Sequence, residues 1–222
     1  MRILVVQHDD QAPSGTIGTA LDARGARVTV VRRDAIPVDP GGHDAVVILG
    51  AVDSVLDHAP GGSWYEREQA LLRRADALDV PVLGVCFGAQ ALAHTFGGHV
   101  YELARPEVGW TTVRTHRPDL VPEGPWLDFH VDAVVPPPGA RILAVSDACV
   151  QAFTCGIHLA VQFHPEVVAA QVDGWCDWLR SSVEAAGASV DRMRADSRRH
   201  EAGNAQRCLA LVDAFLDGKH LL

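Results

Sequence analysis

Short apolar runs rich in valine and isoleucine alternate with helical patterns through the first half of the chain. The runs are Arg2–Gln7, Arg27–Val31, Asp44–Leu49 and Pro81–Val85. Helical patterns lie between them at Ser14–Ala23 and Trp64–Leu78. Near-continuous apolar strands that are joined through helices are typical of a parallel sheet buried on both faces. This alternation therefore predicts an α/β fold with helices on both sides of a mostly parallel sheet.

The second half of the chain has shorter runs with few helices between them. Strands are expected at Val100–Leu103, Trp110–Thr115, Trp126–His130, Arg141–Val145, Val150–Thr154 and His158–Phe163. Such a series predicts an antiparallel extension of the sheet. Helices are expected at about Val168–Ala185 and Asn204–Leu216, with the charged stretch Asp191–Glu201 as a solvated connecting helix. We therefore expect one domain over residues 1–222, with a C-terminal helical segment at about 184–222.

Length, charge and cysteine content exclude several classes of protein. The chain has 222 residues, 48% of them hydrophobic, and a formal net charge of −9. No apolar run approaches the roughly 20 residues of a membrane-spanning helix, and the opening MRILVVQHDD is typical of a strand and not of a signal peptide. A negative chain without basic clusters argues against nucleic-acid binding. Five cysteines, an odd number, suit a reducing cytoplasm, so we expect a cytoplasmic protein with neither a membrane nor a nucleic acid as partner.

A cysteine between two glycines marks the junction of a strand and a helix. The segment Gly84-Val85-Cys86-Phe87-Gly88 follows an apolar strand, and a helical pattern begins at once. This order is typical of a nucleophile elbow, in which a tight turn holds one side chain above the sheet. The following helix directs its free N–H groups at the sulfur, which favours the thiolate. We interpret Cys86 as a nucleophile and not as a merely buried cysteine.

A second group of candidate residues follows the last expected strand. A cysteine nucleophile needs a base, and the base needs a group that orients it. His164 and Glu166 are two residues apart and would point to the same face in an extended segment. Open α/β sheets bind ligands at the carboxyl ends of their strands. His164 is therefore predicted to lie close to Cys86.

Two motifs carry a resemblance to a known family. Cys86-Phe87-Gly88-Ala89-Gln90 together with Gln162-Phe163-His164-Pro165-Glu166 resembles the class I (triad) glutamine amidotransferases, especially stand-alone members similar to the glutaminase domain of GMP synthase. The resemblance extends to Ile48-Leu49-Gly50, Glu107-Val108-Gly109-Trp110 and Phe129-His130-Val131-Asp132. It implies a flavodoxin-like open sheet.

The resemblance also implies roles for individual residues. Cys86 would be the nucleophile, His164 the general base and acid, and Glu166 the residue that orients His164. The oxyanion hole would come from Gly50, Ala51 and the N–H of Phe87. Substrate would be bound by Gln90, His130, Val131 and Asp132. No group of His, Cys, Asp and Glu has zinc-ligand spacing, so we expect no metal and no cofactor.

Two departures from the family pattern leave the substrate open. Ala51 and Val131 stand where the family usually has glycine, in the oxyanion loop and in the His-Gly-Asp element. One hypothesis is a glutaminase that passes ammonia to a separate synthetase. Another is a γ-glutamyl hydrolase or peptidase that acts on a γ-glutamyl conjugate, and a third is a non-catalytic regulatory module. The stripe of Trp175, Trp178 and Leu179 is expected to belong to the core.

Overall fold

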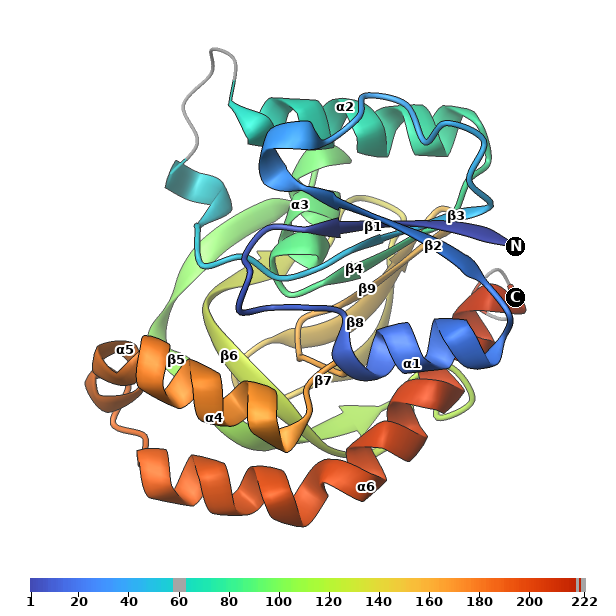
Figure 1. Cartoon of the computed structure of the whole chain (residues 1–222). Coiled ribbons are helices and arrows are strands. Elements are labelled where there is room, and N and C mark those ends of the chain that lie inside the picture. The colour runs from blue at the N-terminus through green and yellow to red at the C-terminus, as the bar shows by residue number, and fades with distance from the viewer. Residues whose placement is uncertain (58–62, 219, 221–222) are drawn as a thin grey trace.

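The structure, a computed structural model, describes residues 1–57, 63–218 and 220. Over these residues the strands form one nine-stranded sheet in the order β2-β1-β3-β4-β9-β8-β7-β5-β6 (Figure 1). The first five strands in this order are parallel. They are β2 (Arg27–Arg32), β1 (Arg2–Gln7), β3 (Ala45–Ile48), β4 (Val82–Val85) and β9 (His158–Val161). The four strands predicted for the parallel half are thus confirmed, with boundaries shifted by at most one residue. The strand predicted at His158–Phe163 was wrongly assigned to the antiparallel extension, because as β9 it pairs with β4 in parallel.

The predicted antiparallel extension is confirmed as well. It consists of β8 (Val150–Cys155), β7 (Arg141–Val145), β5 (His99–Thr115) and β6 (Gly124–Val135). The prediction of two strands at Val100–Leu103 and Trp110–Thr115 was wrong, because both belong to the single strand β5. The pairing register of β5 shifts between Glu102 and Glu107, so the strand continues through a bulge at the point where the sequence pattern breaks.

Alternate residues of the parallel strands pack into separate cores on the two faces of the sheet. In β1, Ile3 and Val5 pack with α1 (Gly15–Ala23) and the end of α6 (Val190–Leu216). Leu4 and Val6 pack with α2 (Trp64–Ala77) and α3 (Phe87–Thr95). Figure 1 shows these helix pairs on opposite sides of the parallel strands. Burial on both faces explains the unbroken apolar runs of the sequence.

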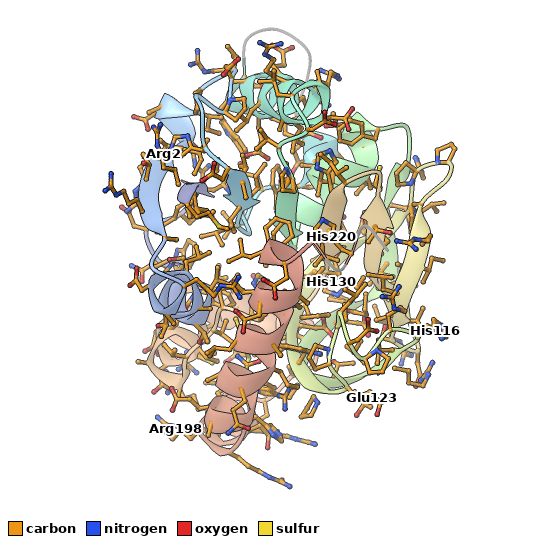
Figure 2. The ribbon with its side chains drawn as sticks, turned by 90° about the vertical axis from the view of Figure 1, so that its right-hand side faces the viewer. Arg2, His116, Glu123, His130, Arg198 and His220 are labelled. Atoms are coloured by element: carbon orange, nitrogen blue, oxygen red, sulfur yellow. The ribbon has the colours of Figure 1, made fainter. Side chains whose placement is uncertain are left out.

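The C-terminal helices differ from the prediction in two places. The helix expected at Val168–Ala185 is divided at Leu179 into α4 (Ala169–Trp178) and α5 (Arg180–Ala185). The charged stretch Asp191–Glu201 is no separate connecting helix. It is part of α6, which in Figure 2 runs along one face from the region of Arg198 toward His220. The stretch is held in place because Trp110 Nε1 donates to the buried Ser197 Oγ at 2.9 Å.

Two short 3₁₀ helices, Arg33–Ala35 and Val55–Asp57, complete the described secondary structure. None of the described helices combines the length and apolar character that crossing a membrane requires.

Candidate active site

Cys86 occupies the strained turn between β4 and α3. Its φ of 51° lies in the left-handed region that side chains rarely adopt. A β-carbon on Gly84 would lie 2.5 Å from the carbonyl oxygen of Gly88, and one on Gly88 would collide with the carbonyl of Ile48. Glycine is therefore required at both places. The predicted elbow geometry is present around Cys86.

The loop after β9 places His164 beside Cys86. The strand ends at Val161, earlier than predicted, but the His164 N–H donates to the Leu127 carbonyl oxygen at 2.8 Å and so fixes the segment. Parallel pairing of β4 with β9 brings their carboxyl ends together. His164 Nδ1 lies 2.8 Å from Oε1 of the buried Glu166. The structure thus brings together all three residues of the predicted triad.

The electrostatics of His164 favour its protonated form. Burial alone would lower the pKa of His164, but the Glu166 carboxylate and the Cys86 sulfur, which is within hydrogen-bonding reach, raise the pKa well above its usual value. With Nδ1 directed at Glu166, the other ring nitrogen is available to Cys86. The arrangement can hold a proton close to the sulfur and deliver it to a group bound there.

The predicted oxyanion loop follows β3. A β-carbon on Gly50 would lie 2.9 Å from Cε1 of His164, so the triad itself requires glycine at this position. Ala51 lines the cavity in front of Cys86. Phe87 is the buried first residue of α3 and follows Cys86 directly. Gly50 and Ala51 therefore line the cavity together with Cys86, and Phe87 is the next residue in the chain.

A buried ion pair behind this loop was missed by the sequence analysis. His8 follows β1 directly, and its Nδ1 lies 3.2 Å from the carbonyl oxygen of Gly50. Its Nε2 lies 2.6 Å from Oε2 of Glu68, and both side chains are fully buried. Because both partners accept hydrogen bonds, both ring nitrogens donate and the ring is positively charged. The signal was the position of His8 at the carboxyl end of a parallel strand, where ligand sites gather.

The charge on His8 has a direct structural consequence. Burial alone would lower the pKa of His8, but Glu68 and the Gly50 carbonyl outweigh it and raise the pKa. In a trans peptide the carbonyl and the following N–H point in opposite directions. Because His8 holds the Gly50 carbonyl oxygen, the N–H of Ala51 points to the side of the peptide opposite His8.

The predicted substrate-binding residues line the same cavity. Gln90 Nε2 donates to the Asp132 carbonyl oxygen at 3.2 Å. The Asp132 carboxylate accepts a hydrogen bond from Ser54 Oγ, which joins it to the loop after β3. Val131 is 47% exposed, with its side chain at the mouth of the cavity. His130 is buried, and its Nδ1 lies 2.9 Å from the Asp132 carbonyl oxygen.

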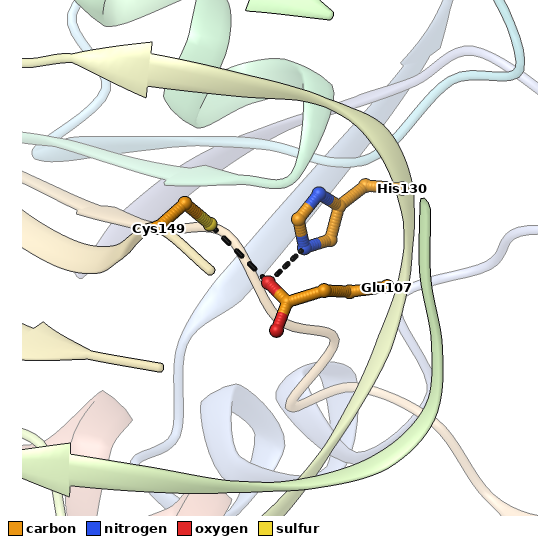
Figure 3. Close-up of side chains that lie close together, drawn as sticks. All are labelled: Glu107, His130 and Cys149. Carbon is orange, nitrogen blue, oxygen red and sulfur yellow. Dashed lines mark hydrogen bonds and ion pairs between the residues drawn. The ribbon is translucent and has the colours of Figure 1, made fainter. Parts of the chain in front are cut away.

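His130 leads into a second buried cluster (Figure 3). Its Nε2 lies 3.4 Å from Oε2 of Glu107 and 3.6 Å from Oδ1 of Asp128. The buried thiol of Cys149 donates to the same Glu107 oxygen at 3.3 Å. Burial lowers the pKa of His130, but the two carboxylates and Cys86 raise it to about 10.

Among the described residues, one group has ligand atoms close enough to hold a metal ion. It consists of Glu107, His130 and Cys149, whose ligand atoms lie within 4.8 Å of one another. Glu107 Oε2 already accepts hydrogen bonds from Ser146 Oγ at 3.1 Å and Gln151 Nε2 at 2.9 Å, besides Cys149. A cation at this oxygen would have to displace those donors. The cluster is therefore a hydrogen-bond hub centred on Glu107.

The cavity in front of Cys86 has a volume of about 520 Å³. Trp175 is buried in an apolar cluster, as expected of a core residue. The same prediction was wrong for Trp178, which is 43% exposed and lines the cavity together with Leu179. The break between α4 and α5 falls at these residues, which places them at the cavity and not in the core.

Comparison with known sequences places the chain in a known family. The model of the family described as glutamine amidotransferase class-I matches residues 14–174. Over 100 residues the chain is 41% identical to a subunit of the glutamine-hydrolysing GMP synthase of Sulfolobus acidocaldarius, covering 41% of this chain and 53% of that one. Over 203 residues it is 34% identical to the glutamine-hydrolysing GMP synthase of Ralstonia pickettii, covering 82% of this chain and 36% of that protein. The chain thus spans about half or less of the length of these relatives.

Solved structures share the fold. A glutamine amidotransferase from Methylobacillus flagellatus superposes with a TM-score of 0.90 at 23% identity, covering 98% of this chain and 94% of that one. A second one, from Thermotoga maritima, superposes with a TM-score of 0.87 at 20% identity, covering 98% of both chains. The predicted flavodoxin-like open mixed sheet is confirmed.

Proposed function

Given that this chain belongs to the class I glutamine amidotransferase family, we propose that it hydrolyses the γ-amide of glutamine or of a γ-glutamyl conjugate. The observation that supports this most directly is the contact of Cys86, His164 and Glu166 at the ends of two adjacent parallel strands. A side chain in a strained turn, with a protonated imidazole beside it, has the arrangement of a cysteine nucleophile with its acid.

In the first half-reaction, the Cys86 sulfur attacks the γ-carbonyl carbon and forms the S–C bond. The carbonyl π electrons move to oxygen, where the N–H groups of Phe87 and Ala51 stabilise the charge. The tetrahedral intermediate collapses and the C–N bond breaks. The leaving nitrogen takes a proton from His164 and departs as ammonia or an amine, leaving a glutamyl thioester.

In the second half-reaction, water gives a proton to His164 while its oxygen attacks the thioester carbon. The C–S bond breaks, glutamate is released and the sulfur returns to its starting state. Glu166 keeps the ring of His164 in one orientation throughout, and is itself not a proton carrier.

The proposal is tested by Cys86→Ala, with Cys155→Ala as the matched control. Cys155 is half-buried on β8, away from the cavity lining. We expect Cys86→Ala to abolish release of ammonia or amine and labelling by 6-diazo-5-oxonorleucine, and Cys155→Ala to keep both. Wild-type protein that is neither labelled nor active would instead support the non-catalytic regulatory module.

The ammonia version of the proposal includes a partner. Two relatives that the chain matches are named as one subunit of a glutamine-hydrolysing GMP synthase, so the proposed acceptor of ammonia is a separate synthetase. Addition of the synthetase should then raise the rate of glutamine hydrolysis and form its aminated product. Glutaminase activity that does not respond to a synthetase would contradict this version.

The conjugate version rests on different residues. Ala51 and Val131 add β-carbons at two walls of the cavity, where the family pattern leaves space for glutamine. This favours a substrate whose contacts extend beyond the glutamine head group, and a comparison of kcat/KM for glutamine and for γ-glutamyl amides decides between the versions.

A further inference from the structure

The amine that leaves the thioester must lie next to His164, because it takes its proton from that ring. The wall of the cavity at this place is Trp175. Its ring centroid lies 4.9 Å from that of His164, with the two planes at 77°. Trp175 is rigidly held, since its Nε1 donates to the Gln11 carbonyl oxygen at 2.7 Å. Trp175 is only 4% exposed, so it forms the buried edge of a wall that its more exposed neighbours continue.

This apolar wall continues beyond Trp175. The ring of Phe129 lies 5.9 Å from that of Trp175 in an edge-to-face contact. Trp178, Val108 and Leu179 line the cavity beside them. Trp178 leaves 43% of its surface exposed, although a large aromatic side chain gains free energy by burial. An apolar group that entered the cavity here would cover it.

The volume of the cavity is larger than glutamine requires. Glutamine has ten non-hydrogen atoms, which would fill at most about 300 Å³ even at the roughly 30 Å³ that each water molecule occupies in the liquid. The cavity measures about 520 Å³. Glutamine releases ammonia, which makes no use of an aromatic wall.

The charged side chains that line the cavity limit which charged groups the leaving amine can carry. Among the described residues that line it there are five carboxylates and no lysine or arginine; the carboxylates are Asp9, Asp53, Asp57, Glu102 and Asp132. Arg33, behind the lining, pairs with Asp9 and Asp53 and so is not available to a ligand. The cationic rings of His130 and His164 also line the cavity, but they are already paired with Glu107, Asp128 and Glu166. A leaving group with a carboxylate, such as an amino acid or peptide, would therefore meet repulsion without an unpaired cation among the described lining residues.

We propose that Trp175, Phe129 and Trp178 form a leaving-group subsite for γ-glutamyl amides of apolar, neutral or cationic amines. This inference rests on the proposed function, because it assigns the amine that the thioester chemistry releases. It distinguishes such amides from γ-glutamyl peptides, whose leaving groups are anionic.

The first test compares kcat/KM for glutamine, γ-glutamylphenethylamide and γ-glutamylglutamate. We expect the phenethylamide to exceed γ-glutamylglutamate by at least about tenfold, the lower end of what one pocket contact contributes to discrimination. Trp178→Ala should lower the ratio of phenethylamide to glutamine by about tenfold. Leu78→Ala is the matched control, because Leu78 is also 43% exposed but lies at the end of α2, outside the cavity lining. It should leave the ratio unchanged.

A second test measures binding without turnover, using calorimetry on Cys86→Ala protein. The phenethylamide should bind more tightly than glutamine, and adding Trp178→Ala should remove the difference. Equal kcat/KM for the phenethylamide and γ-glutamylglutamate, or an equal loss on all three substrates in Trp178→Ala, would overturn the subsite. If wild-type protein cleaves none of them, the proposed function fails, and the binding measurement still decides whether the subsite exists.

Discussion

His8 and His130 are buried histidines at two different walls of the cavity. Each uses Nδ1 to hold a carbonyl oxygen of a cavity-lining segment: Gly50 at 3.2 Å for His8, and Asp132 at 2.9 Å for His130. Each directs Nε2 at buried or half-buried carboxylates. The two walls are thus built in the same way, from a charged ring that holds one peptide group.

The two histidines differ in how the second ring nitrogen is held. Nε2 of His8 makes a hydrogen bond of 2.6 Å to Glu68. Nε2 of His130 lies between Glu107 and Asp128 at 3.4 and 3.6 Å, and it has no partner with hydrogen-bond geometry among the residues that the structure describes. His8 is therefore fixed by directional bonds, whereas His130 is held by charge. We call the segment of Gly50 and Ala51 the oxyanion wall and the segment of Val131 and Asp132 the substrate wall. We expect catalysis at the oxyanion wall to depend on the hydrogen-bond geometry of His8, and the stability that His130 gives to the substrate wall to depend on pH.

The largest effect is expected for His8→Phe. The new ring keeps the aromatic contacts with Trp64 and Phe87, at 4.9 and 5.2 Å between centroids in the wild type. It leaves Glu68 as a buried charge without its partner, which costs about 3–5 kcal/mol of unfolding free energy. The Gly50–Ala51 peptide also loses its anchor, so kcat should fall by about 100-fold, as for loss of an oxyanion donor.

Denaturant unfolding and Michaelis curves on the same His8→Phe preparation check both expectations. A folded variant with a raised KM and an unchanged kcat would show that His8 does not position the oxyanion wall.

Val131→Gly tests the opposite wall. Removing this side chain gives the family's His-Gly-Asp pattern and opens the mouth of the cavity, so kcat/KM for glutamine should rise relative to γ-glutamylphenethylamide. Changes of one pocket contact alter discrimination by about 1–3 kcal/mol, or roughly 10–200-fold. Val135→Gly on the same strand is the control, since Val135 is 53% exposed and outside this cavity lining. Equal changes on both substrates would remove Val131 from the head-group pocket.

The charge on His130 predicts a loss of stability in alkali. Its pKa is raised from 6.5 to about 10 in the folded protein, in a site that Glu107, Asp128 and Cys86 face. The folded state therefore keeps a proton that the unfolded state has lost, and this stabilisation, complete below about pH 6.5, disappears as the pH rises toward 10. The unfolding free energy should fall by up to about 1.4 kcal/mol per pH unit in this window.

Urea unfolding of wild type and His130→Gln at pH 7, 8 and 9 measures this difference. The wild type should lose stability more steeply than the variant. Parallel pH dependence in the two proteins would mean that His130 is not charged in the folded state.

The smallest effect is expected for Glu68→Gln, which separates geometry from charge at His8. The new amide can donate to Nε2 of a neutral ring, and Nδ1 still donates to Gly50. We expect a loss of about 1 kcal/mol in stability and a kcat within about tenfold of the wild type. Should kcat instead fall as far as in His8→Phe, the charge of the pair and not its hydrogen bonds would support the oxyanion wall.

The local features of the site followed from the sequence. Gly84 and Gly88 around Cys86 predicted the elbow, because a turn that tight excludes a β-carbon in any fold. The alternation of apolar runs with helical patterns predicted a sheet covered on both faces, since burial of both sides of a strand leaves no polar face in its sequence. The pairing of His164 with Glu166 was predicted from a spacing of two residues.

Contacts between distant segments were decided by tertiary structure alone. No local pattern relates His8 to Glu68, which are 60 positions apart and meet because β1 and α2 pack on the same face of the sheet. The helical spacing of Trp178 is the same for a core and for a cavity wall, and the break after α4 made it a wall. Local sequence constrains backbone conformation and burial, whereas the partner of a buried charge depends on which strands and helices become neighbours.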